Sequence, residues 1–92
     1  MEIIVPPTTE RVESPVIEIP PGGHVVFGLH GLNIGDVTVG HKIEVLVDSE
    51  WFDHLSWPSS EPTIIVYGSS ENEIIVRAVK TATRNPIGIR VA

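Results

Sequence analysis

Cysteine is absent from the 92 residues, so the protein has neither disulfides nor thiol chemistry. No stretch of ten or more residues places apolar side chains at the 3.6-residue spacing of an amphipathic helix. There is no apolar run long enough to span a membrane, and the start of the chain lacks the basic and apolar segments of a signal peptide. The sequence therefore predicts a fold without substantial helix, no membrane partner, and synthesis in the cytoplasm without export.

Basic residues are also scarce, with six Lys and Arg against twelve Asp and Glu and a net charge of −6. A protein that binds nucleic acid in general needs a basic face, so this class of partner is not expected. Between Ile43 and Val76 there are seven acids and no Lys or Arg, whereas Ile74 to Ala92 carries four bases and no acid. Such a division suits contacts between copies or with a larger assembly. Ordinary solvated charge explains it equally well.

What the sequence does contain is a series of short segments in which apolar and polar residues alternate, separated by eight glycines and eight prolines. Segments of this kind at intervals of about 8–12 residues are typical of an antiparallel β-sandwich. The length allows one domain, which we place in residues 16–92. We expect the strand at Glu73–Lys80 to form a hairpin with the strand at Thr63–Tyr67. The predicted strands are Val16–Ile19, His24–His30, Val37–Val39, Lys42–Trp51, Thr63–Tyr67, Glu73–Lys80 and Pro86–Val91.

Residues 1–15 differ from the rest, because prolines at positions 6, 7 and 15 interrupt any regular hydrogen-bonded ladder. We interpret this segment as an extended N-terminal arm or an irregular edge strand. As an arm, it would reach a neighbouring subunit and add Ile3, Ile4 and Val5 to the edge of that subunit's sheet.

The stretch from Lys42 to Pro58 holds the clearest strand and both tryptophans. Its alternation, if it continues, places Trp51 on the core side, so we predict one core strand that runs to Trp51. The following residues, Phe52 to Pro58, are predicted to form a surface loop. Large aromatic side chains in such a loop serve as anchors in protein interfaces or as platforms for sugars. Packing of Phe52 and Trp57 over the open end of the sandwich is an equal alternative.

Side chains capable of catalysis or metal binding form no recognisable site. His24 and His30 are roughly 20 Å apart along an extended strand, and the chain has no HxH or HExxH pattern. The spacing of Asp48, Glu50 and Asp53 does not match a calcium-binding EF-hand loop, so a solvated acidic loop explains them better. No GxSxG or GxGxxG motif is present. We therefore predict no catalytic residue, no metal and no cofactor.

Three runs of the sequence carry a resemblance to a known family: IPPGGHVVFGL, VTVGHKIEVLVD and EPTIIVYGSSENEIIVRAVKTAT. Across Val16 to Val91 the chain resembles immunoglobulin-like domains of bacterial and bacteriophage proteins, without the cysteine pair of antibody domains. The resemblance implies an all-β, immunoglobulin-like antiparallel sandwich of about seven strands with an extended N-terminal arm. Small, acidic, cysteine-free domains of this kind resemble capsid decoration (cement) proteins and surface appendages of phage virions.

The sequence thus favours a non-enzymatic structural module, a phage capsid decoration or virion surface protein that binds capsid or other assembly subunits and forms homo-oligomers. The alternative is a carbohydrate-binding module that uses the aromatic loop from Phe52 to Trp57, with His54 nearby. The residues predicted to contact protein partners are Ile3, Ile4, Val5, Phe52, His54, Trp57, Arg77, Arg84 and Arg90.

Overall fold

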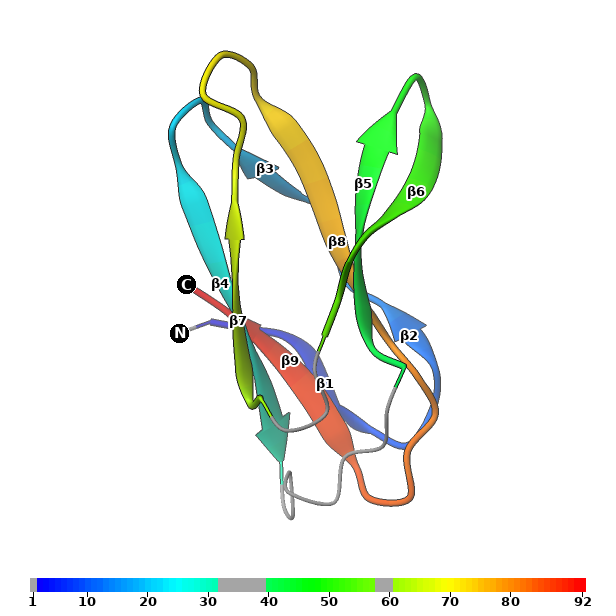
Figure 1. The fold of residues 1–92 in the computed structure, drawn as a ribbon. Helices are drawn as coiled ribbons and strands as arrows, with labels where there is room; N and C mark the ends of the chain where they lie inside the picture. Colours follow the sequence, from blue (N-terminus) through cyan, green and yellow to red (C-terminus); the bar gives the residue numbers. More distant parts are fainter. Residues whose placement is uncertain (1, 32–39, 58–60) are drawn as a thin grey trace.

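The computed structural model describes residues 2–31, 40–57 and 61–92, which form two antiparallel sheets packed face to face (Figure 1). One sheet has the strand order β1-β9-β4-β7, and the other has the order β2-β8-β5-β6 with β3 also paired to β8. No helix occurs in these ranges. The strands are β1 (Glu2–Thr8), β2 (Val12–Glu13), β3 (Ile17–Ile19), β4 (His24–Gly31), β5 (Lys42–Val47), β6 (Glu50–Ser56), β7 (Thr63–Tyr67), β8 (Ile74–Lys80) and β9 (Ile87–Val91).

The predicted all-β sandwich is confirmed, with nine strands where about seven were expected. The additional strands arise because the segment before residue 16 contributes two strands and because the predicted strand from Lys42 to Trp51 is divided by a turn. The strand predicted at Val37–Val39 lies outside the described residues.

The N-terminal segment is an irregular edge strand of the protein's own sheet. β1 pairs with β9, with Ile3 opposite Arg90 and Val5 opposite Ile89, and its register shifts on both sides of Val5. The second shift spans Pro6 and Pro7, which cannot donate ladder hydrogen bonds. Of the two interpretations of this segment, the edge strand describes it, and a contact of Ile3, Ile4 and Val5 with a neighbouring subunit stays a prediction.

β2 and β3 follow the same edge of β8, one after the other. Between them, buried Ser14 keeps contact with β8 although Pro15 interrupts the ladder. The Ser14 backbone N–H donates to the Ala78 carbonyl at 2.8 Å, and the Ala78 N–H donates to Ser14 Oγ at 2.9 Å. A side-chain oxygen thus takes the place of a backbone acceptor.

The predicted hairpin between Thr63–Tyr67 and Glu73–Lys80 is wrong. β7 pairs with β4 in one sheet, whereas β8 pairs with β5 and the N-terminal strands in the other. The connection from residue 68 to residue 73 crosses from sheet to sheet instead of joining two neighbours. Alternation predicted each strand correctly but contains no information about which sheet it joins.

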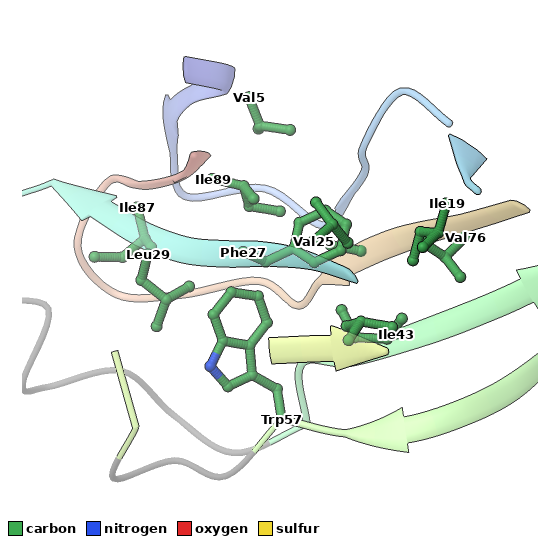
Figure 2. Packing of buried hydrophobic residues seen from close by; sticks show 12 residues of the cluster. Val5, Ile19, Val25, Phe27, Leu29, Ile43, Trp57, Val76, Ile87 and Ile89 are labelled. Carbon is green, nitrogen blue, oxygen red and sulfur yellow. The ribbon is translucent and has the colours of Figure 1, made fainter. Parts of the chain in front are cut away.

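The core lies between the sheets and is formed by aliphatic side chains around Phe27, with Trp57 entering from the chain that follows β6 (Figure 2). In the predicted core strand Ile43 is buried, but Val47 on the same face is 47% exposed because β5 extends beyond the opposite sheet's cover. The buried cluster comprises Val5, Ile19, Val25, Phe27, Leu29, Ile43, Trp57, Val66, Val76, Ala78, Ile87 and Ile89.

Two buried polar side chains hold the connection between β8 and β9. Lys80 is fully buried, and its Nζ donates to the carbonyls of Glu10 (2.7 Å) and Thr81 (2.9 Å) and to Thr83 Oγ1 (3.2 Å). Burial lowers the pKa of Lys80. His41 Nδ1 accepts a hydrogen bond from the Thr81 backbone N–H at 3.0 Å, so its ring proton resides on Nε2. Burial, and next the charge of Lys80, lowers the pKa of His41 and keeps the ring neutral.

Candidate interaction surface

The β5–β6 hairpin is formed by a two-residue turn at Asp48 and Ser49. Both residues have positive φ angles, 50° and 67°, as a type I′ turn requires. This turn matches the right-handed twist of the two strands, although neither residue is the glycine that usually marks it. The prediction of one core strand from Lys42 to Trp51 is therefore wrong, and the predicted loop from Phe52 onward is strand β6.

The outer face of this sheet carries a chain of alternating charges that crosses four strands. From β2 toward β6 the N–O distances are 2.6 Å for Arg77–Glu13, 2.8 Å for Arg77–Glu44, 3.4 Å for Lys42–Glu44 and 2.7 Å for Lys42–Asp53. Neighbouring opposite charges on adjacent strands stabilise the pairing of a sheet. The predicted contact residue Arg77 is thus engaged within its own chain.

Glu44 and Trp51 complete this outer face. Burial disfavours the charged form of Glu44, but hydrogen bonds from Arg77 and Lys42 outweigh it, so the pKa of Glu44 is lowered. The guanidinium of Arg77 also stacks over the Trp51 ring, 4.1 Å from its centroid. Trp51 therefore lies on the outer side of the sheet, and its predicted core position is wrong.

The opposite side of the hairpin is apolar and exposed. In the register of the hairpin, Phe52 is opposite Val45 and Leu55 is opposite Ile43, so both share the face that buries Ile43. Yet Phe52 is 49% exposed, Leu55 37% and Val47 47%. We call these three residues, Val47, Phe52 and Leu55, the hairpin apolar surface.

Val47 is exposed because the hairpin is longer than the rest of its sheet, whereas Phe52 and Leu55 are exposed on β6, the edge strand. β5 pairs with β8 only over Lys42–Val45, whereas it pairs with β6 as far as Val47 and Glu50. Among the described residues β6 has no strand on its outer side, so it also offers a free sheet edge. In Figure 1 the upper half of the hairpin diverges from β8 and extends alone.

The end of the molecule around this surface is acidic. The β5–β6 turn and the connection between β7 and β8 lie at the same end of the sandwich (Figure 1). Residues 47–51 and 68–73 contain exposed Asp48, Glu50, Glu71 and Glu73 and no Lys or Arg. An apolar surface at an acidic end of the molecule is complementary to a partner that presents apolar side chains among Lys and Arg.

Trp57 does not belong to this surface. Only 3% of Trp57 is exposed, and its indole lies in the core cluster (Figure 2). Its backbone N–H donates to the His41 carbonyl at 2.9 Å, and its indole Nε1–H donates to the Glu61 carbonyl at 2.8 Å. The prediction that Trp57 contacts a partner or stacks on a sugar is therefore wrong, because no ligand can reach a ring enclosed in this way.

The other predicted contact residues are dispersed. Exposed His54 is the extra residue of a bulge in β6, where the register shifts between Ile43 and Glu44. Exposed Arg84 lies in the connection between β8 and β9, at the opposite end of the sandwich from the hairpin turn (Figure 1). Arg90 is on β9 and donates from Nε to His30 Nδ1 at 3.0 Å. The predicted residues thus form no single site, and only Phe52 belongs to the hairpin apolar surface.

Within the described ranges, no group of three or more His, Cys, Asp and Glu side chains is arranged to hold a metal ion. The same part of the chain contains no helix suited to crossing a membrane.

Comparisons with known proteins identify no relative of this chain. No protein-family model matches it. Neither the curated proteins nor the solved structures include a significant match to this sequence or fold.

Proposed function

We propose that this protein is a non-enzymatic interaction module that docks onto a protein partner through the hairpin apolar surface. The observation that carries this proposal is the exposure of Val47, Phe52 and Leu55 on the side of the sheet that faces the core elsewhere. Burial of such side chains is a favourable contribution to association, and large aromatic side chains such as Phe52 dominate interface energetics.

The acidic residues at this end of the molecule define the chemistry of the partner. Asp48, Glu50, Glu71 and Glu73 favour a partner surface that carries Lys and Arg around an apolar centre. Charges at the rim of an interface act mainly on the rate of association and on its salt dependence. Binding should therefore weaken as salt is added, while its apolar centre supplies the remaining affinity.

The assembly that we propose for this module is a virion, on which it serves as a capsid decoration or surface protein. Two features support this assignment: the resemblance of Val16–Val91 to phage immunoglobulin-like domains, and a small acidic sandwich with no cysteine. The partners would be capsid subunits, with further copies of the chain as neighbours.

Sedimentation of particles from the source of the protein tests this proposal. The wild-type chain should sediment with the particles in a fixed ratio and should be released by high salt. Phe52→Asp places a charge in the centre of the surface and should leave the chain in the free fraction, with an unchanged circular dichroism spectrum. The control is Val16→Asp, because Val16 is 56% exposed and lies outside the hairpin.

Two outcomes would contradict the proposal. In the first, the wild-type chain sediments only as a free monomer beside the particles. In the second, Phe52→Asp and Val16→Asp remain bound to the same extent, which would show that the hairpin apolar surface is not the contact.

A further inference from the structure

The outer face of the β1-β9-β4-β7 sheet contains a hollow of about 540 Å³, a volume in the range of small-molecule sites. His30 on β4 and Arg90 on β9 stand on this face, because the preceding residues Leu29 and Ile89 are buried on the inner face. The described residues that line the hollow are Pro7, His30, Gly31, Pro86 and Arg90.

Two glycines bring the prolines to the walls of this hollow. At Gly88 a Cβ atom would collide with the Val5 carbonyl and the Pro7 nitrogen, so only glycine lets the bulged part of β1 cross β9 here. At Gly31, which has a φ of 141°, a Cβ atom would collide with the Pro86 carbonyl. Glycine at these two positions thus permits the close approach of both backbones. This approach places the pyrrolidine rings of Pro7 and Pro86, which lack N–H groups, in the walls of the hollow.

The polar side chains that line the hollow are those of His30 and Arg90. Arg90 Nε–H donates to His30 Nδ1 at 3.0 Å, so His30 Nδ1 is an acceptor and its ring proton lies on Nε2. Among residues 2–31, 40–57 and 61–92, neither the two terminal NH₂ groups of Arg90 nor the Nε2–H of His30 has a further hydrogen-bond partner. A guanidinium end of this kind matches the two oxygens of a carboxylate.

Arg90 also differs from Arg77 and Lys42, the two cations of the charged outer face on the other sheet. Arg77 and Lys42 each contact carboxylates within 4 Å, whereas Arg90 contacts none among residues 2–31, 40–57 and 61–92. Although the chain has a net charge of −6, the guanidinium of Arg90 is bonded to a histidine, is flanked by proline rings and takes no part in the ion pairs described above.

We propose that this hollow binds a small carboxylate with an apolar body. The carboxylate pairs with the terminal NH₂ groups of Arg90 and accepts from His30 Nε2–H, while the apolar body lies against the rings of Pro7 and Pro86. Such a carboxylate is present both in a free organic acid and at the C-terminus of a peptide. The site lies on the other sheet from the hairpin apolar surface, so it does not depend on the function proposed above.

A titration followed by ¹H–¹⁵N NMR tests this site. Phenylacetate should produce saturable shifts at the amides of Gly31, Gly88 and Arg90, whereas uncharged phenylacetamide should bind at least about tenfold more weakly. A short peptide that ends in phenylalanine, compared with its C-terminal amide, separates the two sources of the carboxylate. Tighter binding of the peptide acid indicates a chain terminus, and tighter binding of phenylacetate indicates a free acid.

Variants assign the interaction to Arg90. Arg90→Gln should weaken phenylacetate binding by roughly ten- to a hundredfold, because it removes the charge-assisted hydrogen bonds. Arg84→Gln is the matched control, since it removes the same charge from an exposed position and should leave binding unchanged. Arg90→Lys keeps the charge without the planar fork and should therefore show an intermediate loss of binding. This variant also tests the role of Arg90 if Arg90→Gln does not fold.

Three results would overturn the proposal. The first is equal affinity for phenylacetate and phenylacetamide. The second is a loss of binding in Arg84→Gln as large as in the Arg90 variants. The third is the absence of a saturable shift at these amides at tens of millimolar ligand.

Discussion

Trp51 lies on β6 and Trp57 directly follows this strand, six positions along the chain, but the two side chains lie in opposite environments. Trp51 stacks under Arg77 on the outer face, amid a chain of ion pairs. Trp57 is 3% exposed, with both its N–H groups bonded to backbone carbonyls. This difference indicates that the hairpin contributes most to the free energy of unfolding at its base, where Trp57 packs into the core. The distal half, with Phe52 on its apolar side, is left for contact with another molecule.

Trp57→Ala is the strongest way to break this comparison. Removal of a buried indole should lower the free energy of unfolding by about 3–5 kcal/mol, because it leaves a cavity beside Phe27 and Leu29. That loss is a large fraction of the stability of so small a domain. Urea unfolding followed by circular dichroism measures it. A loss below about 1 kcal/mol would contradict the core role of Trp57.

As the pH falls, the stabilising contribution of His41 at the base of the hairpin should be lost before that of Glu44 on the outer face. The pKa of His41, whose carbonyl accepts the Trp57 N–H, is lowered by burial and then by Lys80. Unfolded histidine takes up a proton near pH 6.5, and folded His41 does so only at a lower pH. The free energy of unfolding therefore falls as the pH falls below about 6.5. Glu44 has a lowered pKa as well, so its contribution is lost only below about pH 4.5.

Urea unfolding from pH 8 to pH 4 separates these two windows. His41→Gln should remove most of the decline that begins near pH 6.5, whereas His54→Gln, which changes an exposed histidine, should keep it. An unchanged decline in His41→Gln would contradict the role given to His41.

Trp51→Ala is the counterpart of Trp57→Ala with a much smaller expected effect. It removes a stacking contact with Arg77 at a position that is partly exposed, which is worth about 0.5–1 kcal/mol. The same urea experiment measures the change. A loss as large as that of Trp57→Ala would show that the outer face, and not only the core, depends on an aromatic ring.

The strands could be predicted from the sequence because alternation reports which residues share a face, and Thr63–Tyr67 was located without error. The turn at Asp48–Ser49 could not, since neither residue is glycine or asparagine and the apolar alternation continues into Trp51. Without that turn, the sequence predicts a core position for Trp51 and a surface loop for Trp57, the reverse of their environments in the structure. The pairing of β1 with β9 and the assignment of β7 and β8 to different sheets depend on contacts between distant residues, which local patterns do not report.

The candidate site was predictable only in part. The sequence leaves an exposed Phe52 and a Phe52 packed over the open end of the sandwich as equal alternatives, and it places Val47 in the core because Val47 is in phase with Ile43 and Val45. Its exposure follows from the length of β5 beyond its pairing with β8, a tertiary property. Buried Lys80 and His41 were likewise missed, because their partners are backbone groups of connections far along the chain.

The most direct test is the unfolding free energy of the double variant Phe52→Ser/Leu55→Ser, measured in urea beside the wild type and Trp57→Ala. If the hairpin apolar surface is available for a partner and does not hold the fold together, the double variant should stay within about 1 kcal/mol of the wild type. A loss of about 3 kcal/mol or more, as expected for Trp57→Ala, would place Phe52 and Leu55 in the core and contradict the proposed function.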